Sequence, residues 1–468
     1  MSTGGVVGEA PSETLAPVAN GATAKRDRSL PPGPREPPVV QMLRWILRPI
    51  AFMESAHARY GDVFSVRFLG FERPMIMLSD PDALRALYTE HQHGLPPGRT
   101  LTLRPVLGPS SVLLLEGQDH LARRKLMLPP FHGERMRSYE STMREIAERE
   151  LASWPLDEPF ALQPRMQALT LEVILRAVFG VSGSERAARL RELLPRLVGQ
   201  TASGALQLRV IIASRLRRGE PLEGVHTLMS AIDELLLAEI AERRRDPELG
   251  DRQDILSLLI GARFADGGAM DDRELRDQLL TLLLAGHETT ATALAWTFDL
   301  LLRNPPVLAR LLSELDQSDG DVDGEYLRAV VAESLRLRPV VPLAGRRLGA
   351  ELRAGRWTLP PGTDVTPAIW LTHMRADLYP EPKAFRPERF LSDPPSTYAW
   401  IPFGGGVRRC LGAAFAEFEM RVVLATVLRR LRLEPVGAAP ERIARRNVTF
   451  SPRTGTRVRV RAPSAVAA

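Results

Sequence analysis

A single cysteine, Cys410, stands in a stretch rich in glycine and arginine near the C-terminal end of this 468-residue chain. The stretch reads Phe403-Gly404-Gly405-Gly406-Val407-Arg408-Arg409-Cys410-Leu411-Gly412. One thiol cannot form a disulfide within the chain. Its glycine neighbours would allow backbone N–H groups to approach the sulfur, and the arginines would favour its thiolate. The pattern is typical of a soft metal ligand; the alternative is an inert buried cysteine, the commoner state of a free thiol.

The pattern F-x-x-G-x-R-x-C-x-G resembles the heme-ligand loop of the cytochrome P450 family. Five positions match it: Phe403, Gly406, Arg408, Cys410 and Gly412. In that family the cysteine thiolate ligates heme iron and favours O–O cleavage. The resemblance therefore implies heme (iron protoporphyrin IX) as the cofactor and Cys410 as the metal ligand. It also implies that Arg408 holds a propionate and that Phe403, Gly404 and Gly412 lie against the cofactor.

A second motif lies at the centre of an unusually long candidate helix, residues 272–304, which the following prolines end. It reads Ala285-Gly286-His287-Glu288-Thr289. A glycine weakens a helix by about 1 kcal/mol relative to alanine, so its presence suggests close approach of a cofactor. An acid and an alcohol can carry the protons that oxygen activation requires. A zinc-protease H-E-x-x-H fails because its fifth residue is Ala291. The match to the family's A-G-x-(D/E)-T implies catalytic roles for Glu288 and Thr289, and cofactor contact for Ala285 and Gly286.

Two further motifs depend on charged pairs. His120 and Arg124 are four residues apart, so on a helix they share a face and can bind one anion. The resemblance makes that anion a heme propionate. Glu333 and Arg336 form an E-x-x-R pair, and Arg389 follows in P-E-R-F. In the family such residues form a structural triad that locks the cysteine loop.

The remaining site candidates come from the resemblance. An arginine after residues 339–345 is expected on a propionate, and the sequence does not choose between Arg346 and Arg347. The irregular segment 93–107 is predicted to be a long loop above the substrate. The candidate pocket residues are Leu101, Leu103, Leu107, Val341, Leu343 and Phe450.

The four motifs follow the family's order across residues 30–462. We expect one cytochrome P450 domain there, mainly α with a smaller β region (α+β) and a long central helix over the heme. Residues 1–29 are predicted to be a disordered segment and 463–468 a flexible tail. A first helix, 42–60, should be interrupted at Pro49, with Met42, Trp45, Ile46 and Ile50 packed on the core.

No run of about 20 apolar residues is present, so no transmembrane anchor is expected. The chain is predicted to be a monomer of a bacterial cytoplasm. Its net charge of +6 does not indicate nucleic acid, because the basic residues are nearly all arginine and the acidic residues are spread among them.

The sequence contains no G-x-G-x-x-G after a strand and no second cysteine. Electrons should therefore come from a separate ferredoxin or flavodoxin with its reductase, docking near Cys410. The predicted function is a heme-thiolate monooxygenase that inserts one oxygen atom from O2 into an apolar small molecule, such as a terpenoid, fatty acid or steroid. The alternatives are a peroxide-driven or rearranging heme-thiolate enzyme, against which the Glu288–Thr289 pair argues, and a non-catalytic heme-binding sensor.

Overall fold

The computed structural model describes residues 30–461 apart from 70, 72, 90–103, 132, 134, 181–183, 202–222, 393 and 447. The predicted terminal segments 1–29 and 463–468 lie outside these ranges, as do the pocket candidates Leu101 and Leu103. Within them, no helix is long and apolar enough to cross a membrane.

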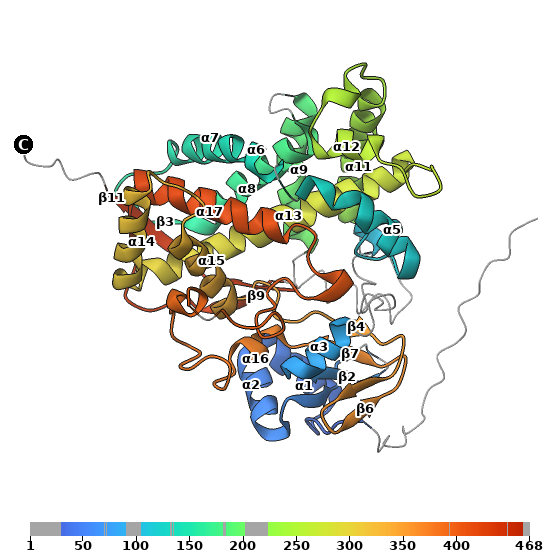
Figure 1. Cartoon of the computed structure of the whole chain (residues 1–468), viewed down its shortest axis with the longest axis vertical. Helices are drawn as coiled ribbons and strands as arrows, with labels where there is room; N and C mark the ends of the chain where they lie inside the picture. The colour runs from blue at the N-terminus through green and yellow to red at the C-terminus, as the bar shows by residue number, and fades with distance from the viewer. Residues whose placement is uncertain are drawn as a thin grey trace, which may run out of the picture.

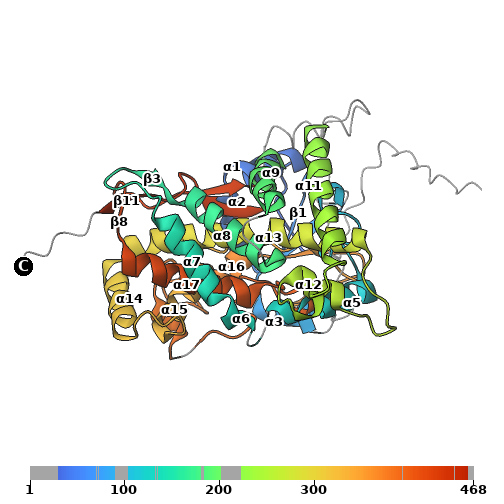
Figure 2. The same ribbon diagram turned by 90° about the horizontal axis from the view of Figure 1, so that it is seen from above.

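Helix α13 (Asp272–Leu302) runs through the middle of the molecule, and the other helices are arranged around it (Figures 1 and 2). At its first turn, the side chain of Asp271 accepts a hydrogen bond from the backbone N–H of Glu274. Pro305 begins the next helix three residues beyond its end. The sequence predicted this element as residues 272–304, so only the last two positions differ.

Helix α8 (Leu162–Phe179) packs along α13 through apolar side chains and through polar contacts that include the next two. Gln163 Nε2 donates to Thr292 Oγ1 at 3.2 Å, and Thr170 Oγ1 donates to the carbonyl oxygen of His287 at 2.9 Å. The other helices of the main body are α4 (Arg104–Leu107), α5 (Gly117–Met127), α6 (Arg135–Ser138), α7 (Glu140–Leu151), α9 (Glu185–Thr201), α11 (Glu223–Arg243), α12 (Ile255–Gly261), α14 (Pro305–Gln317), α15 (Glu325–Leu337) and α17 (Ala413–Arg430). Short 3-10 turns are η1 (Pro129–Phe131), η2 (Leu249–Asp251), η3 (Pro387–Phe390) and η4 (Gly406–Arg408).

A four-stranded sheet has the order β1-β2-β7-β4, with β2 and β7 parallel and the other neighbours antiparallel. Its strands are β1 (Val63–Val66), β2 (Met75–Leu78), β4 (Arg346–Arg347) and β7 (Asp364–Pro367). Figure 1 shows this sheet together with α1 (Pro38–Leu47), α2 (Pro49–Tyr60), α3 (Pro81–Thr89) and α16 (Ile369–His373) at one end of the molecule. The smaller sheets pair β5 (Leu352–Ala354) with β6 (Trp357–Leu359), β9 (Ile443–Arg446) with β10 (Thr449–Pro452), and β11 (Arg457–Arg461) with β3 (Phe160–Ala161) and β8 (Arg432–Pro435).

The first predicted helix is divided at Pro49 as expected, because proline cannot donate the backbone hydrogen bond that would continue α1. The expected burial is wrong for Ile46, whose side chain is 42% exposed. Trp45 does pack inward, with its ring centroid 6.1 Å from that of Phe68. Ile46 and Trp45 point in different directions because successive residues of a helix are about 100° apart.

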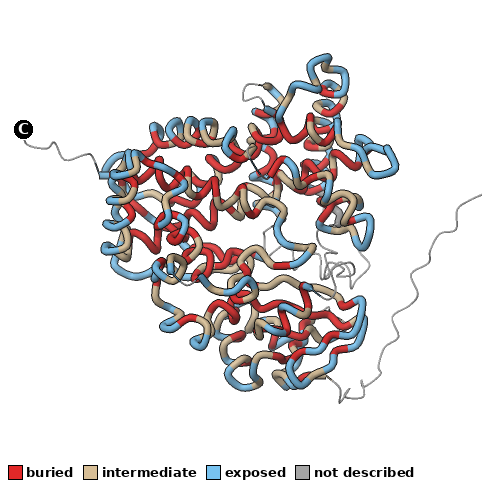
Figure 3. The backbone as a smooth tube through the Cα atoms, viewed as in Figure 1, coloured by how far each residue is buried: buried red, intermediate tan, exposed pale blue. Residues whose placement is uncertain are grey.

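Burial follows this two-part arrangement. Buried residues run through the interior of the helical body and through the four-stranded sheet, while outer helical turns are exposed (Figure 3). One apolar cluster fills the helical body around α13, and two smaller clusters lie on the sheet. The prediction of a mainly α chain with a smaller β region is confirmed.

Candidate active site

Cys410 lies two residues after the end of η4 and three residues before the start of α17. Its backbone N–H donates to the carbonyl oxygen of Phe403 at 2.9 Å, which closes the loop on itself. The thiol is accessible to solvent, yet enough protein surrounds it that burial raises its pKa. A hydrogen bond from the backbone of Gly412 and the charges of Arg124 and Arg409 act in the opposite direction on that pKa. The loop therefore offers an accessible sulfur with donors and cations placed to stabilise its anion.

The glycines of this loop are required by a close neighbour. A Cβ on Gly405 would come within 2.5 Å of the Tyr88 ring, and one on Gly406 within 2.6 Å of the Tyr88 carbonyl oxygen. Gly406 also has a φ of +61°, a conformation that residues with a side chain rarely adopt. The loop can therefore lie against α3 only because these positions lack side chains.

His120 and three arginines, from three separate segments, act on one another. Burial, followed by the charges of Arg408, Arg124 and Arg346, lowers the pKa of His120 to about 4. Burial, together with the charges of Arg346 and Arg124, lowers the pKa of Arg408 to about 10. Arg408 donates to the carbonyl oxygens of Val112 and Leu115. Among the described residues, His120, Arg124 and Arg346 form no ion pair with a carboxylate.

The structure distinguishes the two arginines that the sequence left open. Arg347 donates to Asp364 Oδ1 at 2.7 Å and is already paired. Arg346 is the preceding residue of the strand, so its side chain leaves the opposite face. Among the residues that the structure describes, its side chain donates only to the carbonyl oxygen of Gly345 and its Nε has no partner. Burial lowers the pKa of Arg346. Arg346 is therefore the arginine that joins His120 and Arg408.

The middle of α13 has one open face. Ala285 is exposed and Leu282, Gly286 and Thr289 are partly exposed, whereas every residue from 290 to 302 is buried. These four positions have the spacing of a single helix face. Thr289 Oγ1 donates to the carbonyl oxygen of Ala285 at 2.7 Å. The hydroxyl oxygen consequently keeps its lone pairs available to accept a proton or a water hydrogen bond.

Glu288 is tied to α8. Its Oε2 accepts a hydrogen bond from Gln167 Nε2 at 2.6 Å. Burial raises the pKa of Glu288, and the bond from Gln167 partly offsets that rise. Sequence reasoning missed Gln167, although its spacing from Gln163 and Thr170 makes a polar stripe on an otherwise apolar helix. Gly286 also has a packing role, because a Cβ there would lie 3.3 Å from the side chain of Ile174 on α8.

The predicted structural triad comes together. Arg336 is fully buried and donates to both carboxylate oxygens of Glu333, at 2.6 and 2.7 Å. Arg389 Nε donates to Glu333 Oε1 at 3.3 Å. His373, which the sequence did not single out, joins this group to the cysteine loop: its Nδ1 donates to the Arg336 carbonyl oxygen, and its Nε2 accepts from the backbone N–H of Ile401.

The described pocket candidates do not share one environment. Val341 and Leu343 are partly exposed, and Leu107 is 4% exposed. Phe450 is 1% exposed and its ring lies in a core cluster beside Trp45 and Trp370. The structure therefore places Phe450 in the packing of the core rather than on an open surface.

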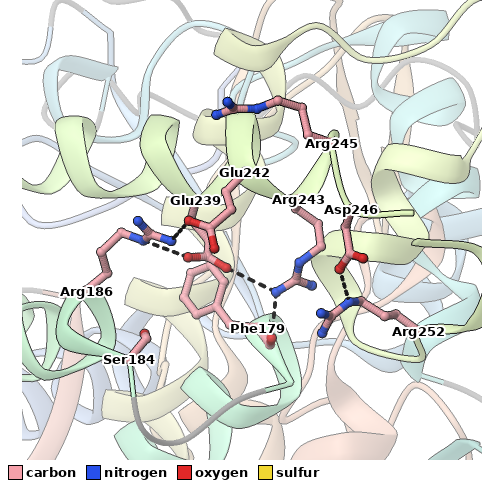
Figure 4. Close-up of a pocket in the computed structure, with 9 residues that line it drawn as sticks. All are labelled: Phe179, Ser184, Arg186, Glu239, Glu242, Arg243, Arg245, Asp246 and Arg252. Carbon is pink, nitrogen blue, oxygen red and sulfur yellow. Dashed lines mark hydrogen bonds and ion pairs between the residues drawn. The ribbon is translucent and has the colours of Figure 1, made fainter. Parts of the chain in front are cut away.

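A separate hollow of about 650 Å³ lies between α9 and α11 and the turn that follows α11 (Figure 4). Its charged side chains neutralise one another: Glu239 accepts from Arg186 and from Arg243, and Arg252 pairs with Asp246. None of its residues belongs to the cysteine loop or to α13. We find no chemical group in it that would favour a reaction.

The residues present fit a heme. Arg124, Arg346 and Arg408 are half-buried cations that lie close enough to act on the same histidine, and among the described residues Arg124 and Arg346 have no carboxylate partner. Such a set favours an anion, and the two propionate groups of heme are such anions. The accessible thiol of Cys410 supplies the soft ligand that iron takes in a thiolate-ligated heme.

Comparison with known proteins gives the same answer. The family model described as "Cytochrome P450" matches residues 31–458. The relative named "Putative cytochrome P450 135B1" of Mycobacterium tuberculosis is 44% identical over 448 residues, 94% of this chain and 93% of the relative. "Putative cytochrome P450 138" of the same organism is 38% identical over 96% of this chain and all of its own.

Solved structures agree. One titled "Retinoic acid bound cyanobacterial CYP120A1" has a TM-score of 0.81 and 25% identity, covering 93% of this chain and 99% of its own. A cytochrome P450DA heme domain has the same fold, with a TM-score of 0.80, 22% identity, and coverage of 93% and 98%. The chain belongs to the cytochrome P450 family, whose members bind heme through a cysteine thiolate and share monooxygenase chemistry.

Proposed function

We propose that this chain is a heme-thiolate monooxygenase that inserts one oxygen atom from O2 into an apolar small molecule. The observation that carries the proposal is the open face in the middle of α13, which holds Thr289 and has the partly exposed Glu288 beside it. A chain that only bound heme would need neither an acid nor an alcohol there.

Cys410 is the proposed iron ligand, since the family uses a cysteine thiolate and this chain has no other cysteine. The cofactor, when bound, supplies O2 binding and O–O cleavage. The protein's part is to hold the sulfur as an anion, for which the Gly412 backbone N–H and the guanidinium groups of Arg124 and Arg409 are suited. His120, Arg346 and Arg408 are proposed to bind the propionates.

Glu288 and Thr289 are proposed to deliver protons. Burial raises the pKa of the Glu288 carboxyl, so it holds a proton more readily than an exposed carboxyl and is better suited to pass one on. Gln167 fixes the direction of that carboxyl by donating to its Oε2. The Thr289 hydroxyl donates a hydrogen bond to the Ala285 carbonyl oxygen, so the hydroxyl oxygen remains free to accept a hydrogen bond from water.

An apolar substrate is favoured by the side chains of the open face and its surroundings. Leu282 and Ala285 are the non-polar members of that face, and Val341 and Leu343 are partly exposed. The retinoic acid of the cyanobacterial structure is an isoprenoid carboxylic acid bound by that protein. We propose a ligand of similar character for this chain, with terpenoids first and fatty acids or steroids as the other members of the class.

Electrons are proposed to come from a separate ferredoxin or flavodoxin with its reductase. Arg409 is exposed beside Cys410, so an acidic partner could dock there. Turnover supported by such a partner should slow as ionic strength rises. A rate independent of salt would argue against docking by charge.

The decisive experiment is the carbon monoxide difference spectrum of the reduced, heme-loaded protein. Thiolate ligation predicts a strongly red-shifted Soret band that is lost in Cys410→Ala. Absence of the band, or its survival in the variant, would overturn the proposal. Spin-state shifts on titration with terpenoids, fatty acids and steroids would then identify the substrate class, with a polar sugar as the matched negative ligand.

A further inference from the structure

Tyr88, near the end of α3, contains a buried group that the proposed function does not use. Its side chain is 1% exposed, and its hydroxyl is a buried polar atom with no hydrogen-bond partner among the described residues. Buried hydroxyl groups are nearly always hydrogen-bonded, since an unmade bond is not compensated by water. An orphaned hydroxyl therefore calls for an explanation.

The ring of Tyr88 already has a structural role. It fills the space beside Gly405, and it stacks on Tyr398 with centroids 6.4 Å apart and planes at 19°. A phenylalanine ring would do both equally well. The hydroxyl is the part of the side chain that packing does not explain.

The hydroxyl lies beside the cysteine loop and within reach of the charge of Arg346. Its oxygen is 4.0 Å from the position that a Cβ of Gly404 would take, at the start of the cysteine loop. The charge of Arg346 acts directly on the phenol, and Arg346 in turn acts on His120 and Arg408. Arg346 Nε is itself a buried donor that has no partner in the described part of the chain. The Tyr88 hydroxyl on α3 and Arg346 Nε on β4 are thus two neighbouring donors at the same candidate site.

We propose that the Tyr88 hydroxyl donates a hydrogen bond to the anion that His120, Arg124, Arg346 and Arg408 surround, which in a heme-loaded chain is a propionate carboxylate. The proposal rests on the proposed heme site. A phenol suits this position because it is a neutral donor. It satisfies one more carboxylate lone pair without adding a further positive charge to the three arginines, which already repel one another. Burial raises the pKa of Tyr88 to about 12, so the phenol keeps its proton at any working pH.

The test uses the heme-loaded variant Tyr88→Phe, which removes only the oxygen. We expect heme transfer to excess apomyoglobin to become about tenfold faster, because a hydrogen bond to a charged group contributes at least one factor of ten in affinity. The resonance Raman bending mode of the propionates should also shift. Tyr398→Phe is the matched control, since it makes the same chemical change in the stacked partner and should leave both readouts unchanged.

Several results would overturn the proposal. One is heme loss within twofold of the wild type with an unmoved propionate mode. Another is that Tyr88→Phe lowers the free energy of unfolding as much in the heme-free protein as in the heme-loaded protein, which would mean that the hydroxyl has a partner in the protein itself. The red-shifted carbon monoxide band of a thiolate-ligated heme should persist in Tyr88→Phe. If the wild-type protein itself lacked this band, the proposed heme-thiolate function would be refuted instead. If Tyr88→Phe does not fold, 3-fluorotyrosine at position 88 is a stronger donor of nearly equal size and should slow heme loss, and an unchanged rate would contradict the proposal.

Discussion

The Glu333–Arg336 pair gives a stringent test of how this fold is held together. Both side chains are fully buried, and the guanidinium donates to both carboxylate oxygens. Arg336 also donates to the backbone carbonyl oxygens of His373, Pro382 and Ala384. The perturbation is Glu333→Gln, which keeps the size and shape of the side chain and removes its charge.

The expected magnitude follows from burial. Removing one partner of a buried ion pair leaves an uncompensated charge and typically costs about 3–5 kcal/mol. The backbone N–H of Arg386 and the guanidinium of Arg389 also donate to Glu333 Oε1, so they lose a charged acceptor as well. We therefore expect Glu333→Gln to lower the free energy of unfolding by at least about 3 kcal/mol.

The chain contains a matched control. Arg189 and Glu192 have the same three-residue separation and a distance of 2.8 Å, but their side chains are 56% and 60% exposed. Solvent screens such a pair, so Glu192→Gln should change the free energy of unfolding by no more than about 0.5 kcal/mol. The difference between the two variants isolates the effect of burial, since sequence spacing and chemistry are the same.

The assay is urea unfolding of the heme-loaded protein followed by circular dichroism, with the slope against urea checked for equality between variants. The double variant Glu333→Leu with Arg336→Met removes both charges together. Its cost should fall short of the sum of Glu333→Leu and Arg336→Met by about 2 kcal/mol or more, because each single change strands a charge that the double change does not. A cost below about 1 kcal/mol for Glu333→Gln would refute the reasoning.

Two further predictions concern the loop and the acid. Gln167→Leu removes the hydrogen bond that lowers the pKa of Glu288, so the acidic limb of the pH profile for coupled turnover should move to higher pH. An unmoved limb would mean that Glu288 does not carry the proton. Gly405→Ala places a Cβ 2.5 Å from the Tyr88 ring and should lower stability by about 1–3 kcal/mol, with reduced heme content by absorbance. Gly250→Ala, where a Cβ meets nothing within 4 Å, is its neutral control.

Short-range patterns explain what the sequence could predict. Prolines follow the helix at residues 272–302, and a proline stop acts over a few residues, so this helix was predicted to within two positions. The cysteine loop and the E-x-x-R pair were found for the same reason. The residue spacing contained all the information that was needed.

Contacts between segments far apart in the chain could not be predicted from the sequence. The choice between Arg346 and Arg347 depends on which face of the strand carries Asp364, a residue 17 positions away from Arg347. Gln167 meets Glu288 across 121 positions. Ile46 was expected to be buried because its helix is apolar on more than one side, and only the packing of Trp45 shows which side faces inward.

His373 connects the structural triad to the cysteine loop by hydrogen bonds to both. Burial lowers the pKa of His373 to about 3, so the ring is neutral. Its partners permit a single tautomer: Nδ1 carries the proton because it faces the Arg336 carbonyl, and Nε2 is bare because it accepts from the Ile401 N–H. Ile401 stands two residues before Phe403, whose carbonyl accepts from Cys410. A buried ion pair contributes little net stability compared with apolar residues of the same size. We therefore infer that the role of the Glu333–Arg336 pair is to hold neighbouring segments in place. Through one histidine, it fixes where the loop that carries the thiol begins.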